Sequence, residues 1–163
     1  MTPKTAPAAS EEDGALSAQE RTSLKERTSE LKAQSRRAKA ADKAAADLND
    51  VLAKIAQMPQ EDRALAQRVH DLVTTAAPHL APKLYYGQPG YAREGKLMCF
   101  FRSGQMDKLR YSTFGFSVEA DLDDASGLWP TSYALTTDAT DEAFERIGEL
   151  VVRASGQPQA ERR

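Results

Sequence analysis

The sequence predicts an α+β fold with a mainly antiparallel sheet of about four or five strands, helices packed on that sheet, and a helical N-terminal tail. Two observations carry this prediction. Apolar residues recur with helical spacing before residue 77 and after residue 140, whereas the region between holds short apolar runs separated by turn residues. Strands grouped together with helices outside them are typical of α+β proteins whose sheet is covered mainly on one face.

Composition excludes several classes of protein. A chain of 163 residues fits one domain with a tail, and a net charge of −2 points to no particular polymer or membrane partner. The single cysteine, Cys99, excludes an internal disulfide and a multi-cysteine zinc site. No apolar run approaches the ~20 residues that span a bilayer, and the start lacks a signal-peptide core. We therefore expect a cytoplasmic protein with no membrane partner.

The first 45 residues are predicted to form a basic tail that is disordered to helical. Residues 1–15 are rich in Pro, Ala, Ser and acidic residues, which predicts disorder. Ser17 and Glu20 then fit a capping box at the start of a helix that runs to about Ala45. The α+β domain is expected over residues 46–155, and residues 156–163 are expected to be disordered.

The helical part of this tail carries a charge pattern and a heptad pattern. The segment from Lys32 to Lys43 has one acidic residue, Asp42, and five basic residues: Lys32, Arg36, Arg37, Lys39 and Lys43. Apolar residues recur every seven positions, at Leu24, Leu31, Ala38, Ala45 and Leu52. Their companion positions are mostly polar, so only half of a coiled-coil seam is present. We expect a solvated helix, with a coiled coil as the alternative.

Three helical segments frame the strand region. The stripe Leu48, Val51, Leu52 and Ile55 is the first able to join a core, and Met58-Pro59 separates it from the next helix. That next helix presents an apolar face between Leu65 and Ala76. The last helix begins at Thr140 or Asp141, carries an apolar face from Phe144 to Ala154, and stops at Gly156.

The strand region is built around Leu97–Phe101, which is apolar without alternation. This pattern predicts an interior strand with both faces covered. Before it, Leu84–Tyr86 suits a strand, and Gln88–Tyr91 reads as a type II turn because Pro89 and Gly90 occupy its two central positions. After it, Arg102–Gln105 is predicted to be a hairpin connection.

Two further strands are predicted after this connection. The first covers Lys108 to Val118, and its apolar positions change phase near Thr113, which predicts a bulge there. The second covers Ser132 to Thr137. Between them, residues 121–130 form an acidic loop that contains Trp129.

Part of this region resembles a known family. The matching residues are Tyr86-Gly87-Gln88-Pro89-Gly90-Tyr91, then Gly95-Lys96-Leu97, Phe100-Phe101 and Lys108 to Phe116. Their order and spacing resemble the YdhG-like family, a bacterial domain family of unknown general function, over roughly residues 47–155. The resemblance implies a compact sheet with helices and, because some members are described as frataxin-like iron chaperones, iron as a possible cargo. The chain departs from the family at residues 81–84, where members often carry an acidic residue.

The sequence contains candidate residues for three kinds of binding site: a small-molecule pocket, a metal site and a nucleic-acid contact. A small-molecule pocket beside the predicted turn would be lined by Tyr86, Gly87, Pro89, Tyr91, Lys96 and Arg110, with tyrosines that pack at the edge of the core as the alternative. A metal would be held by Asp121, Asp123 and Asp124, with a solvated acidic face as the alternative. Nucleic acid would contact Lys32–Lys43, with a solubilising tail as the alternative.

Catalysis is the weakest of the possible functions. Cys99 lies in an apolar run where a thiol is normally inert, and nothing in the sequence places His70 or His79 beside a nucleophile. The sequence therefore predicts a non-catalytic intracellular domain that binds a small ligand or protein partner at the turn-lined edge of its sheet. A frataxin-like iron-handling protein and a nucleic-acid-associated adaptor are the alternatives.

Overall fold

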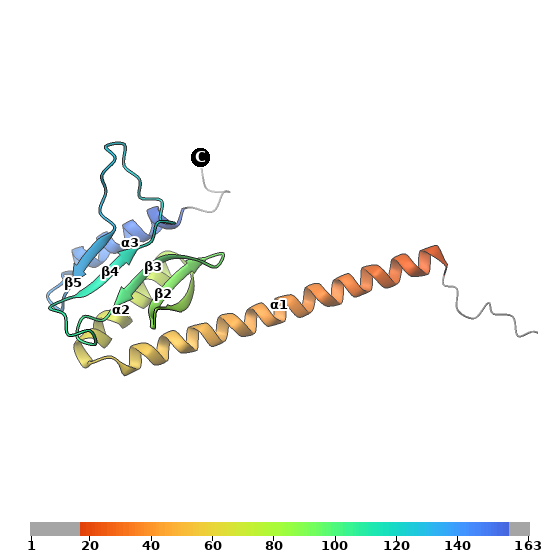
Figure 1. Ribbon diagram of the computed structural model, residues 1–163, viewed down its shortest axis with the longest axis horizontal. Helices are drawn as coiled ribbons and strands as arrows, with labels where there is room; N and C mark the ends of the chain where they lie inside the picture. The colour runs from red at the N-terminus through yellow and green to blue at the C-terminus, as the bar shows by residue number, and fades with distance from the viewer. Residues whose placement is uncertain (1–16, 157–163) are drawn as a thin grey trace, which may run out of the picture. The chain divides into compact units, whose positions relative to one another are not determined.

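The computed structural model describes residues 17–156 and confirms the α+β fold (Figure 1). Its helices are α1 Ala18–Gln57, α2 Gln60–Ala76 and α3 Asp141–Ser155, and its strands are β1 Ala81–Tyr85, β2 Gln88–Arg93, β3 Lys96–Arg102, β4 Ser112–Phe116 and β5 Ser132–Leu135. The chain divides into two units, Met1–Ala41 and Asp42–Arg163. Disorder was predicted for residues 1–15 and 156–163; apart from Gly156, which caps the end of α3, these residues lie outside the described part of the chain.

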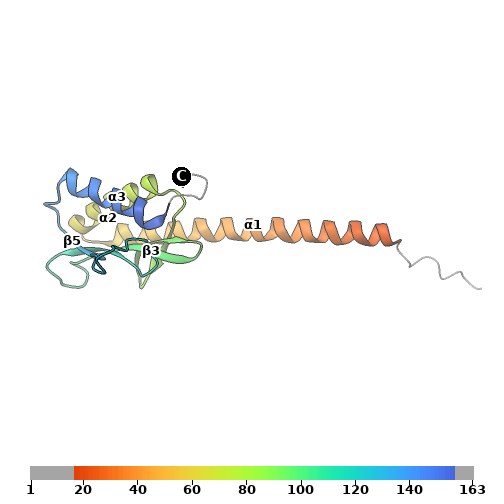
Figure 2. The same ribbon diagram turned by 90° about the horizontal axis from the view of Figure 1, so that it is seen from above.

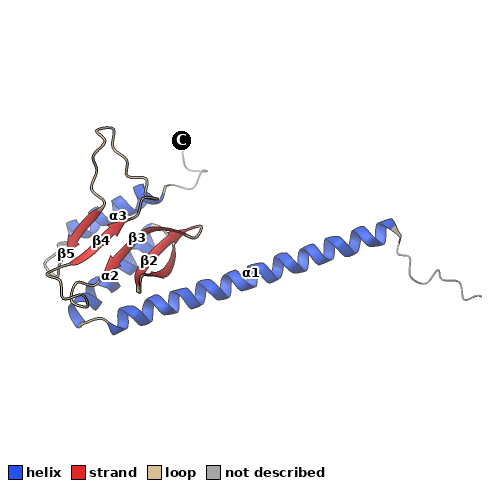
Figure 3. Cartoon of the chain, in the orientation of Figure 1, coloured by secondary structure: helices blue, strands red, loops and turns tan. Residues whose placement is uncertain are grey.

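The strands form one antiparallel sheet in the order β1-β2-β3-β4-β5, so each strand pairs with its neighbours in the sequence (Figure 3). β3 is the middle strand, which confirms the prediction that Leu97–Phe101 lies in the interior of the sheet. Figure 2 shows α2 and α3 on one side of the sheet. Among residues 42–156, no helix packs on the opposite side.

The face toward the helices carries the core. Tyr91, Cys99 and Phe116 lie opposite one another on β2, β3 and β4, and each is at most 6% exposed. They belong to one apolar cluster with residues of all three helices, among them Val51 and Val151. Burial of this cluster supplies the main driving force for folding of the second unit.

The other face, which we call the open face, has a different composition. Gly90, Phe100 and Gly115 lie opposite one another across β2, β3 and β4, and Tyr85 and Arg102 point to the same side by strand alternation. Tyr85 and Phe100 are half-buried and Arg102 is exposed. The open face is therefore partly apolar but accessible.

A β-bulge explains why Leu97–Phe101 does not alternate. Tyr91 pairs with Cys99 and Ala92 with Leu97, so Met98 has no residue opposite it on β2. The bulge lets Met98 and Cys99, consecutive in the chain, both be buried. The expectation that both sheet faces are covered was wrong, because the bulge, and not a second covering layer, breaks the alternation.

The predicted caps at the starts of α1 and α3 are confirmed, but the predicted end of the first helix near Ala45 was wrong. The Ser17 hydroxyl accepts from the Glu20 amide at 3.2 Å, and the Thr140 hydroxyl caps α3 by accepting from the Ala143 amide at 3.2 Å. α1 continues without a break past Ala45 to Gln57, and its Val51 and Ile55 are buried. None of the helices within residues 17–156 is long and apolar enough to cross a bilayer.

The predicted type II turn at Gln88–Tyr91 was wrong, because these residues form the first part of β2. The chain reverses three residues earlier, at Tyr86 and Gly87, whose φ angles are 47° and 73°. Positive φ at both central residues is the conformation of a type I′ hairpin turn, whose twist matches that of the flanking strands.

The strand predicted from Lys108 to Val118 is shorter, and its predicted bulge is absent. β4 begins at Ser112 and pairs with β3 and β5 without a register shift. The predicted connection at residues 102–105 extends over 103–111, because a series of turns fixed by bonds such as Leu109 N–H to Gly104 O (2.7 Å) fills this segment. Leu109 and Tyr111, which suggested the phase change, are exposed residues of this connection. The strand predicted at 132–137 ends at Leu135.

Candidate functional site

A hollow of about 460 Å³ lies on the open face beside the turn between β1 and β2. It is lined by Tyr85, Tyr86, Gln88, Phe100, Arg102 and Asp107. We call it the open-face hollow. Its volume falls within the range typical of small-molecule sites.

Aromatic side chains form the apolar part of the open-face hollow. The rings of Tyr85 and Tyr86 are 4.6 Å apart in an edge-to-face arrangement, and the Tyr85 and Phe100 rings are 5.5 Å apart. Tyr86 is 89% exposed, so its ring has a free face. Three adjacent rings of this kind suit contact with a planar apolar group.

Gly115 lets the Phe100 ring lie across the sheet, and Gly90 makes room for the Leu97 side chain. A Cβ atom on Gly115 would be 2.8 Å from Phe100 Cε1, and one on Gly90 would be 2.7 Å from Leu97 Cδ1. A larger residue at Gly115 would push the ring away from the sheet. Glycine in the interior of a strand often marks such a close approach.

The polar groups of the open-face hollow are held by bonds to its own wall. Arg102 Nε donates to Asp107 Oδ2 at 2.6 Å, and Gln88 Oε1 accepts from the Ser103 amide at 3.3 Å. These bonds orient the two side chains but leave the terminal guanidinium nitrogens of Arg102 and the amide nitrogen of Gln88 as donors. The open-face hollow therefore offers more donors than acceptors.

Asp62 in the first turn of α2 anchors the connection that carries Asp107. Its carboxylate is 4% exposed and accepts from the Ser103 hydroxyl at 2.5 Å and the Gln105 amide at 2.9 Å. The nearby Glu61 accepts from Gln105 Nε2 at 3.0 Å on the surface. The wall of the hollow is thus tied to the helical layer through a buried charge.

The structure separates the six residues predicted to form a ligand pocket. Tyr86 lines the open-face hollow and Gly87 follows it in the turn without lining the hollow, but Pro89 and Tyr91 are buried on the helix side of β2. Lys96 lies at the end of the β2–β3 hairpin away from the open-face hollow, where its Nζ is 4.0 Å from Glu119 Oε2. The guanidinium of Arg110 lies 5.2 Å from the centre of the Tyr111 ring, outside the hollow. Sequence reasoning missed Tyr85, Gln88, Phe100, Arg102 and Asp107.

A buried polar pair lies on the helix side of the sheet. His70 Nδ1 and the Tyr91 hydroxyl are hydrogen-bonded at 2.9 Å, and His70 is 7% exposed. Burial lowers the pKa of His70, although the nearby Asp71 acts to raise it, and burial chiefly raises the pKa of the Tyr91 hydroxyl. Burial also raises the pKa of the Cys99 thiol, so this thiol stays protonated and unreactive.

The His70 pKa predicts a pH dependence of stability. The pKa of His70 is near 6.5 in the unfolded chain and lower in the folded protein. At a pH between these two pKa values, the unfolded state binds a proton that the folded state does not. The free energy of unfolding should therefore fall as the pH drops below 6.5. Denaturant unfolding of the wild type and of His70→Gln between pH 7.5 and 5.5 tests this. The wild type should lose more stability than the variant, and parallel curves would contradict the assignment.

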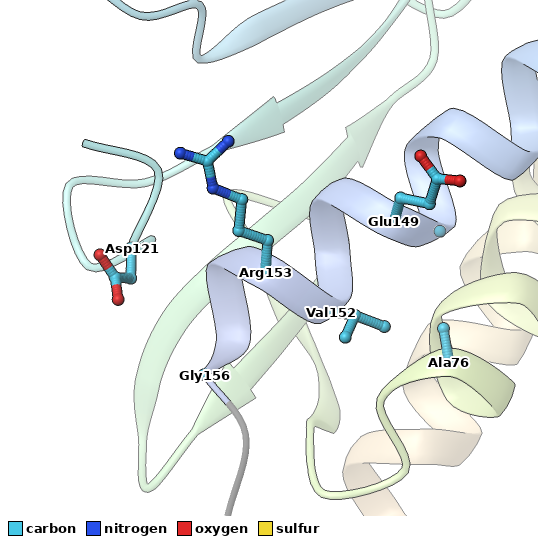
Figure 4. Close-up of a pocket in the computed structure, with 7 residues that line it drawn as sticks. Ala76, Asp121, Glu149, Val152, Arg153 and Gly156 are labelled. Carbon is cyan, nitrogen blue, oxygen red and sulfur yellow. The ribbon is translucent and has the colours of Figure 1, made fainter. Parts of the chain in front are cut away.

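A second hollow, larger but more open, lies between α2 and α3 (Figure 4). Its volume is about 600 Å³, and Ala76, Gly148 and Val152 form its apolar floor. Asp121, Glu149 and Arg153 stand at its margin. We favour the open-face hollow, because the second hollow has no aromatic lining and no polar group oriented by a buried partner.

The aspartates predicted to hold a metal do not converge. Asp124 accepts from the Ser126 hydroxyl and amide, and these hydrogen bonds lower its pKa. Leu122, between the other two aspartates, is 4% exposed, while Asp121 lies at the margin of the second hollow. Among residues 17–156, no three His, Cys, Asp or Glu side chains are grouped so that they could hold a metal ion. The residues present do not fit an iron site.

Comparisons of this chain with protein-family models, with curated proteins and with solved structures found no match. The geometry of the described residues therefore carries the functional argument.

Proposed function

We propose that this chain is a non-catalytic intracellular binding protein that uses the open-face hollow to bind a planar group bearing a hydrogen-bond acceptor. The group belongs to a small ligand or to a side chain of a protein partner. The observation that carries the proposal is the combination of three adjacent rings with two oriented donors in one hollow. The resemblance to the YdhG-like family remains part of the proposal.

The chemistry of the lining defines the ligand class. Tyr85, Tyr86 and Phe100 favour a flat apolar body, because aromatic groups pack edge-to-face or offset-stacked on one another. The free nitrogens of Arg102 and Gln88 favour a carboxylate or carbonyl on that body. Asp107 neutralises part of the Arg102 charge, so a single negative charge on the ligand is sufficient.

Titration with 4-hydroxybenzoate and indole-3-carboxylate, followed by calorimetry, tests the proposal. We expect binding in the millimolar range or tighter for at least one probe. Phe100→Ala and Arg102→Gln should each weaken binding by about tenfold, since each removes roughly 1–2 kcal/mol of contact. Native mass spectrometry of protein purified from its source then tells whether the natural occupant is a small molecule or a protein.

Arg110→Gln is the matched control for Arg102→Gln, because both substitutions remove one exposed guanidinium near the same connection. Arg110 lies outside the open-face hollow, so its replacement should leave the affinity unchanged. If Arg110→Gln weakens binding as much as Arg102→Gln does, or if neither probe binds at 10-millimolar-order concentrations, roughly the weakest affinity worth assigning to a site, the proposal fails.

A further inference from the structure

Helix α1 gathers cations on one face. At about 100° per residue, Arg21, Lys25, Lys32, Arg36 and Lys39 all point within about 60° of one another around the helix axis. We call these five residues the basic face. They extend over about 27 Å of helix at ~1.5 Å per residue. Sequence reasoning found a basic cluster at Lys32–Lys43 but did not separate its residues by face or include Arg21 and Lys25.

The basic face is exposed, and the one carboxylate near it is Asp42 at its C-terminal end. Every residue from 17 to 46 is exposed, and within residues 17–156 no side chain of the basic face forms an ion pair. In the same stretch, Glu20, Glu26 and Glu30 lie more than about 90° around the helix from the centre of the basic face, whereas Asp42, three residues after Lys39, lies beside its C-terminal end. The positive charge of Arg21, Lys25, Lys32 and Arg36 is therefore uncompensated.

Repulsion between neighbouring cations of the basic face favours an anionic binding partner. Arg21 and Lys25 are four residues apart, as are Lys32 and Arg36, and like charges at this spacing repel across one turn. Residues 18–41 hold seven basic and three acidic side chains, whereas residues 42–156 hold twelve basic and seventeen acidic ones. An anionic partner would relieve the repulsion and would be attracted to α1 and not to the second unit.

We propose that the basic face of α1 binds the phosphate backbone of duplex nucleic acid without regard to sequence. Cations four residues apart are about 6 Å apart along the helix, and duplex DNA carries one charge per ~1.7 Å of its axis, so a straight helix meets phosphates along its whole length. α1 has no aromatic residue, which disfavours a single strand recognised by base stacking.

An anionic membrane is the less favoured partner. A helix that lies on a lipid surface needs a broad apolar face of large residues. In residues 18–41 the only large apolar side chains are Leu24 and Leu31, which are 52% and 54% exposed. Two leucines do not form such a face, whereas phosphate binding requires only the cations.

Fluorescence anisotropy with a labelled 30-base-pair DNA duplex tests the proposal on the full chain. With five phosphate contacts, the slope of log K against log salt should be about −4.5. Lys32→Gln with Arg36→Gln should weaken binding and reduce the slope to about −2.7, because two contacts are lost.

Arg27→Gln with Arg37→Gln is the matched control, because it removes the same charge from the opposite half of the helix. This pair should leave the slope unchanged. Equal effects of the two pairs would overturn the proposal by showing a diffuse charge effect, and no binding at 20–50 mM salt, roughly the range in which phosphate contacts are strongest, would also overturn it. Tighter binding to vesicles of phosphatidylserine and phosphatidylcholine than to the duplex, sensitive to the same basic-face pair, would assign the face to membranes instead.

Discussion

Phe101→Ala is expected to lower the free energy of unfolding by about 3–5 kcal/mol. Phe101 is 0% exposed, lies on the middle strand, and faces the helices. Alanine removes most of its buried surface and leaves a cavity between layers that are held apart by the surrounding side chains. Urea denaturation followed by circular dichroism measures the loss.

Tyr86→Ala provides the control for this prediction. Tyr86 is also aromatic but is 89% exposed, so its removal should change stability by less than about 0.5 kcal/mol. Phe101→Leu keeps most of the volume and should fall between the two if Phe101→Ala does not fold. Similar stabilities for Phe101→Ala and Tyr86→Ala would show that β3 is not at the centre of the sheet.

Asp62→Ala is expected to destabilise the protein by about 2–4 kcal/mol, because it leaves the Ser103 hydroxyl and the Gln105 amide without their charged acceptor. The connection that holds Asp107 would also loosen. We therefore expect weaker binding of aromatic acids, although Asp62 does not line the open-face hollow. Chemical denaturation and calorimetry on the same variant measure both effects.

Glu61→Ala is the matched control, since Glu61 is the preceding acidic residue and bonds to the side chain of the same Gln105. It is exposed, so its loss should cost less than about 1 kcal/mol and leave probe binding unchanged. If the two variants behave alike, the buried carboxylate does not anchor the wall of the open-face hollow.

The sequence predicted the fold class because the signals for it are local. Each confirmed signal depends only on neighbouring residues. These signals are the apolar run at Leu97–Phe101, the capping residues Ser17 and Thr140, and the helix end at Gly156. The type II turn was wrong because Pro89 and Gly90 satisfy its local rules, whereas strand pairing places the reversal at Tyr86 and Gly87. Cross-strand pairing cannot be read from a local dipeptide.

The candidate site was predicted only in part because it depends on strand register. Gly115 makes room for the Phe100 ring only when β3 and β4 lie in their actual pairing. Tyr86 was predicted to line the site because it lies beside a turn. Tyr91 was also predicted there, but it lies on the helix side of the sheet, because residues 88–91 form part of β2 and not a turn. Residues 88–93 do not alternate between polar and apolar side chains, and the four from Pro89 to Ala92 are all buried, so no local pattern marks this segment as a strand.

The central claim is that the open-face hollow binds a planar group with an acceptor. Amide chemical shifts of the isotope-labelled full chain, recorded during titration with indole-3-carboxylate, test it most directly. We predict the largest shifts at Tyr85, Gln88, Arg102 and Asp107. Shifts centred on Glu149 and Arg153 of the second hollow, or no shifts at all, would contradict the claim.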